Sequence, residues 1–284
     1  MKYNLDLDFT CNKKTLEMNK NTDFRITSIQ GIEASSYTIH KADINGDGVV
    51  VTGEKIEPRE ITITGDITKN KNETLNREEL ISFFTPKFIG ELVINRNNIK
   101  RKIQYKVESL SFPKSNLFEY ETWALSLLCP DPLWNSVDNY NKNIALITPQ
   151  FAFPLVIPTN KGKIMGYRTY KNEAILNNDG DDETGLEITI IASRGEVTNP
   201  KIELSTGEFI QLKDVTMAKG DVLKINTNKR QKAIRLNGNI TNSYNRQSTF
   251  FALPVGTSTI KYSSDEGYTN MDVNIVFYKK YLGV

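Results

Sequence analysis

The segment that most constrains this chain is Cys129-Pro130-Asp131-Pro132-Leu133-Trp134, which follows a long run of strand-like sequence. A proline cannot donate a backbone hydrogen bond, and its ring restricts the residue before it, so two prolines within three residues end the preceding element. This stop falls near the middle of the 284 residues. The sequence therefore predicts an N-terminal domain over residues 1–135 and a C-terminal domain over residues 136–284.

Strand patterns dominate the N-terminal half. Apolar and polar residues alternate from Tyr3 to Phe9, which is the period of a strand buried on one face. Two long strand-like runs, residues 100–112 and 118–128, predict an extended hairpin. We expect the strands of this hairpin to be suited to pairing with a neighbouring molecule.

One helix is predicted between these strands. Asn76 is placed as its N-cap, with Glu79 three residues later in the capping-box position. Leu80, Phe83 and Phe84 give it an apolar face, and Pro86 follows its expected end. Such a short helix needs a sheet to pack on.

The C-terminal half is almost wholly β in pattern. A polar, Asn-rich stretch, residues 135–143, is interpreted as a linker or an exposed crossover, and many short strand-like runs follow it. Glycine-containing turns such as Asn237-Gly238-Asn239 separate these runs. The regular spacing predicts an antiparallel β-sandwich.

Composition limits the classes of function. The net charge of +2 gives no strong field toward nucleic acid or a membrane, and there is no apolar run of about 20 residues. The N-terminal residues lack the apolar core of a signal peptide, so we expect synthesis in the cytoplasm, where Cys11 and Cys129 stay reduced. With His40 as the single histidine, multi-histidine metal centres are excluded, and we expect His40 to be an ordinary strand residue.

One segment fits the calcium loop of an EF-hand. Residues 43–54, DINGDGVVVTGE, match the pattern D-x-[DN]-x-[DN]-G-x5-E. The ligands would come from Asp43, Asn45, Asp47, Val49 and Glu54. Strand-like sequence before the loop and a proline shortly after it leave no room for the two flanking helices, so a polar loop between strands is the alternative.

Motifs for catalysis and phosphate binding are absent from the sequence, and we predict no enzymatic activity. The acidic run 179–183 is interpreted as a solvated turn. A cluster of cations around the Asn97-Asn98 turn would suit phosphate, but near-neutral net charge favours surface charges beside a hairpin turn; its members are Arg96, Lys100, Arg101 and Lys102. Trp123 lies in an alternating strand and is predicted in the core.

Several segments in order carry a family resemblance. They are Ile29-Gln30-Gly31-Ile32, Asp47-Gly48, PREITITGDI at 58–67, Phe83-Phe84, GELVI at 90–94, LCPDPLW at 128–134, GDVLKINT at 220–227, KAIRLNG at 232–238 and FALPVG at 251–256. Together they resemble the distal tail protein (Dit-like) family of tailed bacteriophages and related phage-tail-like particles. The resemblance spans nearly the whole chain.

The resemblance implies a mainly β fold: an N-terminal β-sandwich with one packed helix and a long hairpin, and a C-terminal galectin-like antiparallel β-sandwich. It implies a baseplate adaptor at the virion tail tip, working as a homohexameric ring. Its partners would be the tail tube protein, the tail-tip hub and a receptor-binding protein, with no membrane and no specific nucleic-acid contact. The alternative is a carbohydrate-binding module that contacts the host cell wall.

Overall fold

The computed structural model describes residues 5–19, 22–67, 73–113, 120–143, 147–149, 166–168 and 172–284. The chain divides into two compact units. The first comprises Met1–Val137 together with Lys280–Val284, and the second comprises Asp138–Lys279. The first domain predicted from the sequence ended at residue 135 and did not include the last five residues. The difference arises because Lys280–Val284 pairs with the first unit.

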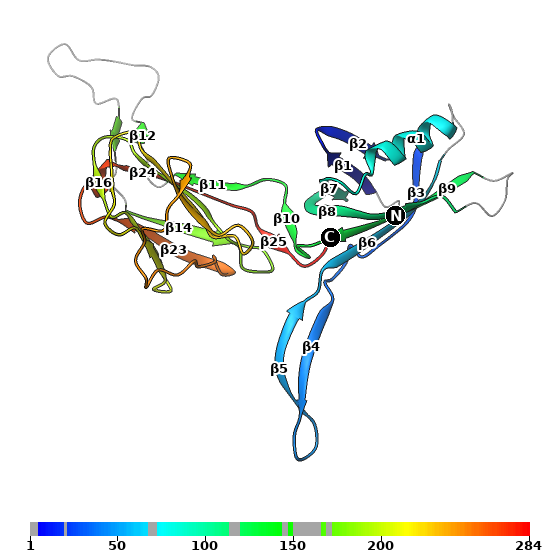
Figure 1. The fold of residues 1–284 in the computed structure, drawn as a ribbon, viewed down its shortest axis with the longest axis horizontal. Coiled ribbons are helices and arrows are strands. Elements are labelled where there is room, and N and C mark those ends of the chain that lie inside the picture. Colours follow the sequence, from blue (N-terminus) through cyan, green and yellow to red (C-terminus); the bar gives the residue numbers. More distant parts are fainter. Residues whose placement is uncertain are drawn as a thin grey trace, which may run out of the picture. The chain divides into compact units, whose positions relative to one another are not determined.

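The first unit is built on one antiparallel sheet with the order β2-β1-β7-β8-β9-β6-β3 (Figure 1). Two short strands, β10 and β25, extend it beside β8. The bounds are β1 Leu5–Cys11, β2 Lys14–Met18, β3 Phe24–Gln30, β6 Arg59–Ile67, β7 Ile89–Arg96, β8 Ile99–Ser111, β9 Glu121–Cys129, β10 Trp134–Ser136 and β25 Lys280–Tyr281. The mainly β fold with one helix is thus confirmed.

Alternation along the strands produces the core of this unit. In β9 every second residue is buried, from Glu121 to Cys129, and β6 repeats the pattern. Trp123 is 1% exposed, so its predicted core position is confirmed. Trp134, at the end of the proline-rich stop, is also in the core of the first unit. The inward side chains of β1, β6, β7, β8 and β9 form one continuous apolar cluster with the helix.

The helix α1 spans Glu73–Phe83 and is packed on this cluster through Leu80, Phe83 and Phe84, as predicted. Phe84 lies edge-on to Phe9, with 5.1 Å between ring centroids. The predicted cap was wrong, because Asn76 lies inside the helix, three residues after its first residue.

The predicted long hairpin exists as β8 and β9, which are antiparallel with pairs from Lys106 opposite Leu128 to Ser111 opposite Ala124. The turn that joins them is outside the described residues. β9 pairs with β6 along its whole length. β8 pairs with β7 only from Ile99 to Lys106, so within the described residues its part 107–111 is paired on the β9 side alone. The expectation that this hairpin pairs with a neighbouring molecule stays a prediction.

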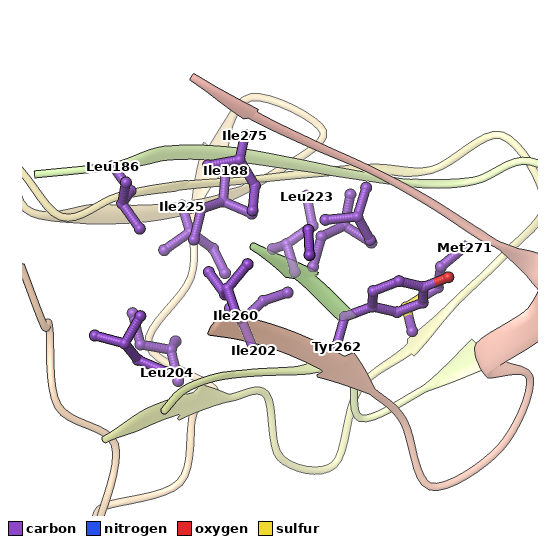
Figure 2. Packing of buried hydrophobic residues seen from close by; sticks show 14 of the residues in the cluster. Leu186, Ile188, Ile202, Leu204, Leu223, Ile225, Ile260, Tyr262, Met271 and Ile275 are labelled. Atoms are coloured by element: carbon purple, nitrogen blue, oxygen red, sulfur yellow. The ribbon is translucent and has the colours of Figure 1, made fainter. Parts of the chain in front are cut away.

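The second unit contains two facing sheets. One has the order β11-β24-β15-β20-β21-β22 and the other β14-β23-β17-β18. The bounds are β11 Tyr140–Asn143, β14 Glu173–Asn178, β15 Glu187–Ala192, β17 Lys201–Leu204, β18 Phe209–Gln211, β20 Val222–Asn226, β21 Ala233–Leu236, β22 Asn239–Ile240, β23 Gly256–Ser263 and β24 Met271–Phe277. Buried side chains of the two sheets meet between them, among them Ile188 and Leu223 from one sheet and Ile202 and Ile260 from the other (Figure 2).

Smaller elements complete the described chain. The pairs β12 Ile147–Pro149 with β13 Gly166–Arg168 and β16 Val197–Thr198 with β19 Thr216–Met217 form short ribbons, and η1 Tyr268–Asn270 is a single 3-10 turn. The stretch 135–143 is not a plain linker, because it contributes to β10 and β11. The strand predicted over residues 151–157 lies outside the described residues. The described helices include none that is long and apolar enough to cross a bilayer.

Candidate assembly surface

A second hairpin, β4 Tyr37–Asp43 with β5 Val49–Ile56, forms a two-stranded sheet by itself and projects from the first unit (Figure 1). Every residue of β4 is exposed, and so are six of the eight in β5. A lone two-stranded ribbon is at best marginally stable in water. Its exposed apolar side chains make it a candidate assembly surface.

The two faces of this hairpin differ in chemistry. Because cross-strand partners share a face, the register of the two strands sorts their side chains. Tyr37, Ile39, Val49 and Val51 lie on one face, and each is about half exposed, from 48% to 58%. Their cross-strand partners put Ile56 and three charged residues, Lys41, Asp43 and Glu54, on the same face, so it is apolar with charges interspersed. We call this the apolar face. On the opposite face lie mostly polar or small residues, namely Thr38, His40, Ala42, Val50, Gly53 and Lys55.

The local sequence explains the shape of the hairpin. Gly46 and Gly48 have φ values of 150° and 99°, and Gly48 in particular adopts a backbone conformation that favours glycine. They lie between the last residue of β4 and the first of β5 and reverse the chain. His40 pairs with Gly53 and Lys41 pairs with Val51, so Thr52 is an extra residue in β5 and forms a bulge. Because of this bulge, residues of β5 on both sides of Thr52 still share a face with their partners in β4.

The predicted calcium loop coincides with the tip of this hairpin, and the structure does not bring all its ligands together. Asp43 lies opposite Val49, whereas Glu54 lies opposite Ile39, four residues back along β4. At about 3.3 Å per residue, the two carboxylates are separated by roughly 13 Å along the ribbon. The twelve-residue loop with Glu54 as its closing ligand is therefore not formed, and within the described residues no group of three potential metal ligands occurs.

The root of the hairpin is held by polar contacts. The backbone N–H of Glu57 donates to the carbonyl oxygen of Ser36 at 3.0 Å. The Lys55 ammonium lies 3.3 Å from the Glu57 carboxylate. Hydrogen bonds from the Thr38 hydroxyl and from Lys55 lower the pKa of the Glu57 carboxyl. These contacts join the first residues of β4 to the last residues of β5.

The basic cluster is divided by the structure. Asn97 and Asn98 have φ values of 51° and 69°, which is the tight turn expected between β7 and β8. Arg96 and Arg101 donate to the carbonyl oxygens of Val284 and Gly283. Lys102 pairs with Glu91 at 3.4 Å. Three of the four cations, all but Lys100, are therefore engaged by the protein itself.

The remaining candidates have structural surroundings. His40 is exposed on the polar face of the hairpin. In the acidic run, Asp179 pairs with Lys279 at 2.5 Å, and hydrogen bonding to that lysine lowers the pKa of the Asp179 carboxyl. Cys11 and Cys129 are buried, and burial raises the pKa of the Cys129 thiol to about 12. Among the described aromatic residues of the second unit, only Tyr268 is classed as exposed.

Arg59 was not predicted as a functional residue, although the sequence carries a signal for it. Side chains of β6 alternate between the two faces of the sheet, and Arg59 falls on the same face as Ile61 and Ile63, which points into the core. It is 5% exposed. A charge at an inward position of a strand is a sign of a dedicated polar site.

The fold and the surface define a class of protein: a two-unit β protein with a projecting hairpin that carries exposed apolar side chains, as expected of an assembly component. Two family models match, the phage tail protein RIFT-related domain over residues 11–129 and the C-terminal domain of the siphovirus-type tail component over residues 179–281. Between them they cover well over half of the chain. The chain therefore belongs to the Dit-like family of phage distal tail proteins.

Solved structures show the same fold. The Dit protein (gp 19.1) of phage SPP1, described as a paradigm of the hub adsorption apparatus in phages infecting Gram-positive bacteria, has a TM-score of 0.70 at 17% identity, over 97% of this chain and 99% of that chain. A chain of the phage P2 baseplate in its activated conformation with Ca has a TM-score of 0.55 at 9% identity, over 100% of both chains. The corresponding structure with Sr has a TM-score of 0.52 at 10% identity, over 96% of this chain and 97% of that chain. No curated protein sequence matches significantly.

The family and the fold give the role. The protein is a structural component of the phage tail tip, where it acts as a distal tail adaptor of the baseplate. The carbohydrate-binding alternative gains no support from the described surface of the second unit.

Proposed function

We propose that six copies of this chain close into a ring that joins the tail tube protein to the tail-tip hub and carries the receptor-binding protein. In this ring, the apolar face of β4–β5 lies against a neighbouring copy. The observation that carries the proposal is the set of half-exposed apolar side chains on that face, Tyr37, Ile39, Val49 and Val51, which the face shares with Lys41, Asp43 and Glu54. Closing the ring covers them and removes the open edges of the ribbon.

The hairpin supplies a matched pair of variants to test this. Val51 lies on the apolar face and is 58% exposed, whereas Val50 lies on the opposite face and is 49% exposed. An aspartate at either position is accepted by an isolated chain, because both side chains already reach water. Val51→Asp buries a charge only in the proposed assembly.

Mass photometry with negative-stain imaging measures the outcome. The wild type is expected near six times 32.2 kDa, as rings with a central hole. Val51→Asp is expected near a single chain, and Val50→Asp is expected to assemble like the wild type. Equal assembly of all three proteins would show that the apolar face is not the contact between copies.

The proposed role is structural and without enzymatic activity. The single histidine of the chain, His40, is on the exposed hairpin, which leaves one candidate for a histidine base. A zymogram with host cell walls tests this point. A zone of clearing would contradict it.

Calcium binding at the hairpin tip is retained as a separate proposal. Asp43, Asn45 and Asp47 are close in sequence around a glycine-rich turn, although Glu54 is remote from Asp43. Calorimetry with calcium on the wild type and on Asp43→Ala is the test. Heat in the wild type that disappears in the variant supports a site, and no heat in the wild type ends the proposal.

A further inference from the structure

The root of the hairpin meets a segment from the far end of the chain. Lys280–Val284, which we call the return segment, belongs to the first unit. Its strand β25 pairs with β10, with Trp134 opposite Tyr281 and Asn135 opposite Lys280. The backbone N–H of Val284 donates to the carbonyl oxygen of Ile32 at 3.0 Å, in the loop that leads into β4.

Arg59 joins this segment to both ends of the hairpin. Its buried guanidinium makes five hydrogen bonds, and all five acceptors are neutral oxygens. They are the carbonyl oxygens of Pro132 (2.8 Å), Gly31 (2.6 Å), Glu33 (2.8 Å) and Leu282 (2.7 Å) and the hydroxyl of Ser35 (2.7 Å). Two residues lie between the end of β5 and Arg59, and one residue lies between Ser35 and the start of β4.

A full set of hydrogen bonds matters for this arginine. A buried cation is tolerated only when its donors are satisfied. Its acceptors come from the loop before β4, from the proline-rich stop after β9 and from the return segment. Removal of the return segment therefore leaves a buried N–H without an acceptor and weakens the other contacts at the root.

Further contacts fix the return segment in place. The Arg101 guanidinium lies 3.7 Å from the centroid of the Tyr281 ring, and Arg96 donates to the carbonyl oxygen of Val284 at 2.8 Å. Lys280 pairs with Asp131 at 3.3 Å. At Gly283 a Cβ would lie 2.7 Å from the carbonyl oxygen of Glu33, so the backbones approach closely there.

We propose that Arg59 and the return segment form a clasp that fixes the root of β4–β5, and that assembly through the hairpin requires the clasp to be closed. Arg59 acts as a positioning residue and makes no contact with the neighbouring copy. The part concerning assembly rests on the function proposed above, whereas the part concerning the root stands on the contacts within one chain.

The first experiment isolates the root from assembly. In the Val51→Asp background, amide exchange is compared between the full chain and a chain lacking residues 282–284, for peptides covering residues 31–36 and 55–60. Without the clasp, exchange at the root is expected to be at least about tenfold faster, the factor for one lost hydrogen bond to a charged group. Unchanged exchange at the root would overturn the clasp.

Because truncation of the chain can itself prevent folding, two single-residue variants are compared as well. Gly283→Ala adds one methyl group that the Glu33 carbonyl leaves no space for, and Gly53→Ala adds one on the hairpin where the nearest atom is 4.0 Å away. Gly283→Ala is expected to accelerate exchange at the root, and Gly53→Ala is not. Tryptophan fluorescence confirms that the first unit remains folded, because both tryptophans lie in its core.

The second experiment measures assembly in the background with Val51 intact. The truncated chain and Gly283→Ala are expected to lose rings, and Gly53→Ala is expected to keep them. Faster exchange at the root with intact rings would reject the link to assembly and keep the clasp. Rings that survive Val51→Asp would instead reject the hairpin contact itself, so the two failures are distinct.

Discussion

The two long hairpins of the first unit have similar strand-forming sequences and opposite surroundings. β8–β9 lies in the middle of the sheet, with β7 and β6 as outer neighbours, and its inward side chains are buried. β4–β5 has no neighbour within the described chain beyond its own two strands, and both its faces reach water. Strand length and alternation are therefore enough to form a hairpin, whereas open edges and uncovered apolar side chains determine which hairpin is available for assembly.

Shortening a side chain should lower the free energy of unfolding much more in β8–β9 than in β4–β5. Leu125 in β9 is fully buried, so Leu125→Ala should cost about 2–5 kcal/mol of unfolding free energy. Val51→Ala on β5 should change the stability of the single chain by less than about 0.5 kcal/mol. Urea unfolding followed by tryptophan fluorescence, on proteins kept as single chains, measures both. Similar losses for the two variants would contradict the comparison.

Adding a single methyl group to a glycine in the buried sheet and to a glycine in the exposed hairpin should change the stability by different amounts. A Cβ at Gly65 in β6 would overlap the ring of Trp123 in β9, so Gly65→Ala should cost about 1–3 kcal/mol. At Gly53 in β5 the nearest atom is His40 Cδ2 at 4.0 Å, and Gly53→Ala should be neutral or stabilise the strand by up to about 1 kcal/mol. Thermal unfolding ranks the two. A melting temperature lowered more by the change at Gly53 would show that the hairpin is packed in the single chain.

The smallest expected effect is the response of the hairpin root to acid. Hydrogen bonds from Thr38 and Lys55 lower the pKa of Glu57 in the folded chain. A carboxyl whose folded pKa is below its unfolded pKa stabilises the fold above the unfolded value, and this contribution disappears as the pH falls through the folded value. Limited proteolysis of residues 37–56 should therefore accelerate on acidification, and Glu57→Gln should remove that dependence. An identical acid response in the two proteins would assign it to another group.

Much of the fold was predictable because it depends on local patterns. Alternation identified most strands and the core position of Trp123, and the proline-rich stop marked the end of β9. The helix start was misplaced because Asn76 offers a plausible cap inside a longer helix. The alternation of apolar and polar residues shows which residues form a strand, but it does not show the order of the strands in the sheet. The neighbours of each strand could therefore not be assigned from the sequence. For this reason residues 43–54, which include most of β5, were interpreted as a polar loop between strands, although residues 36–41 were correctly assigned as strand-like.

The candidate surface was less accessible to sequence reasoning. The segment 43–54 attracted a calcium interpretation because acidic and glycine residues serve equally well in a hairpin tip. Arg59 was visible only as an inward-facing charge, and its acceptor at Leu282 lies more than 200 residues further along the chain. Contacts of such long range follow from the folded chain and leave no pattern in a short window.

The most direct test of the central claim is amide exchange of both hairpins in two states. Peptides covering β4–β5 and β8–β9 are compared between the wild-type assembly and the Val51→Asp single chain. The account predicts slow exchange of β8–β9 in both states, and exchange of β4–β5 that is slow in the assembly and fast in the single chain. Equally fast exchange of β4–β5 in both states would show that the ring, if formed, does not cover this hairpin, and would contradict the account.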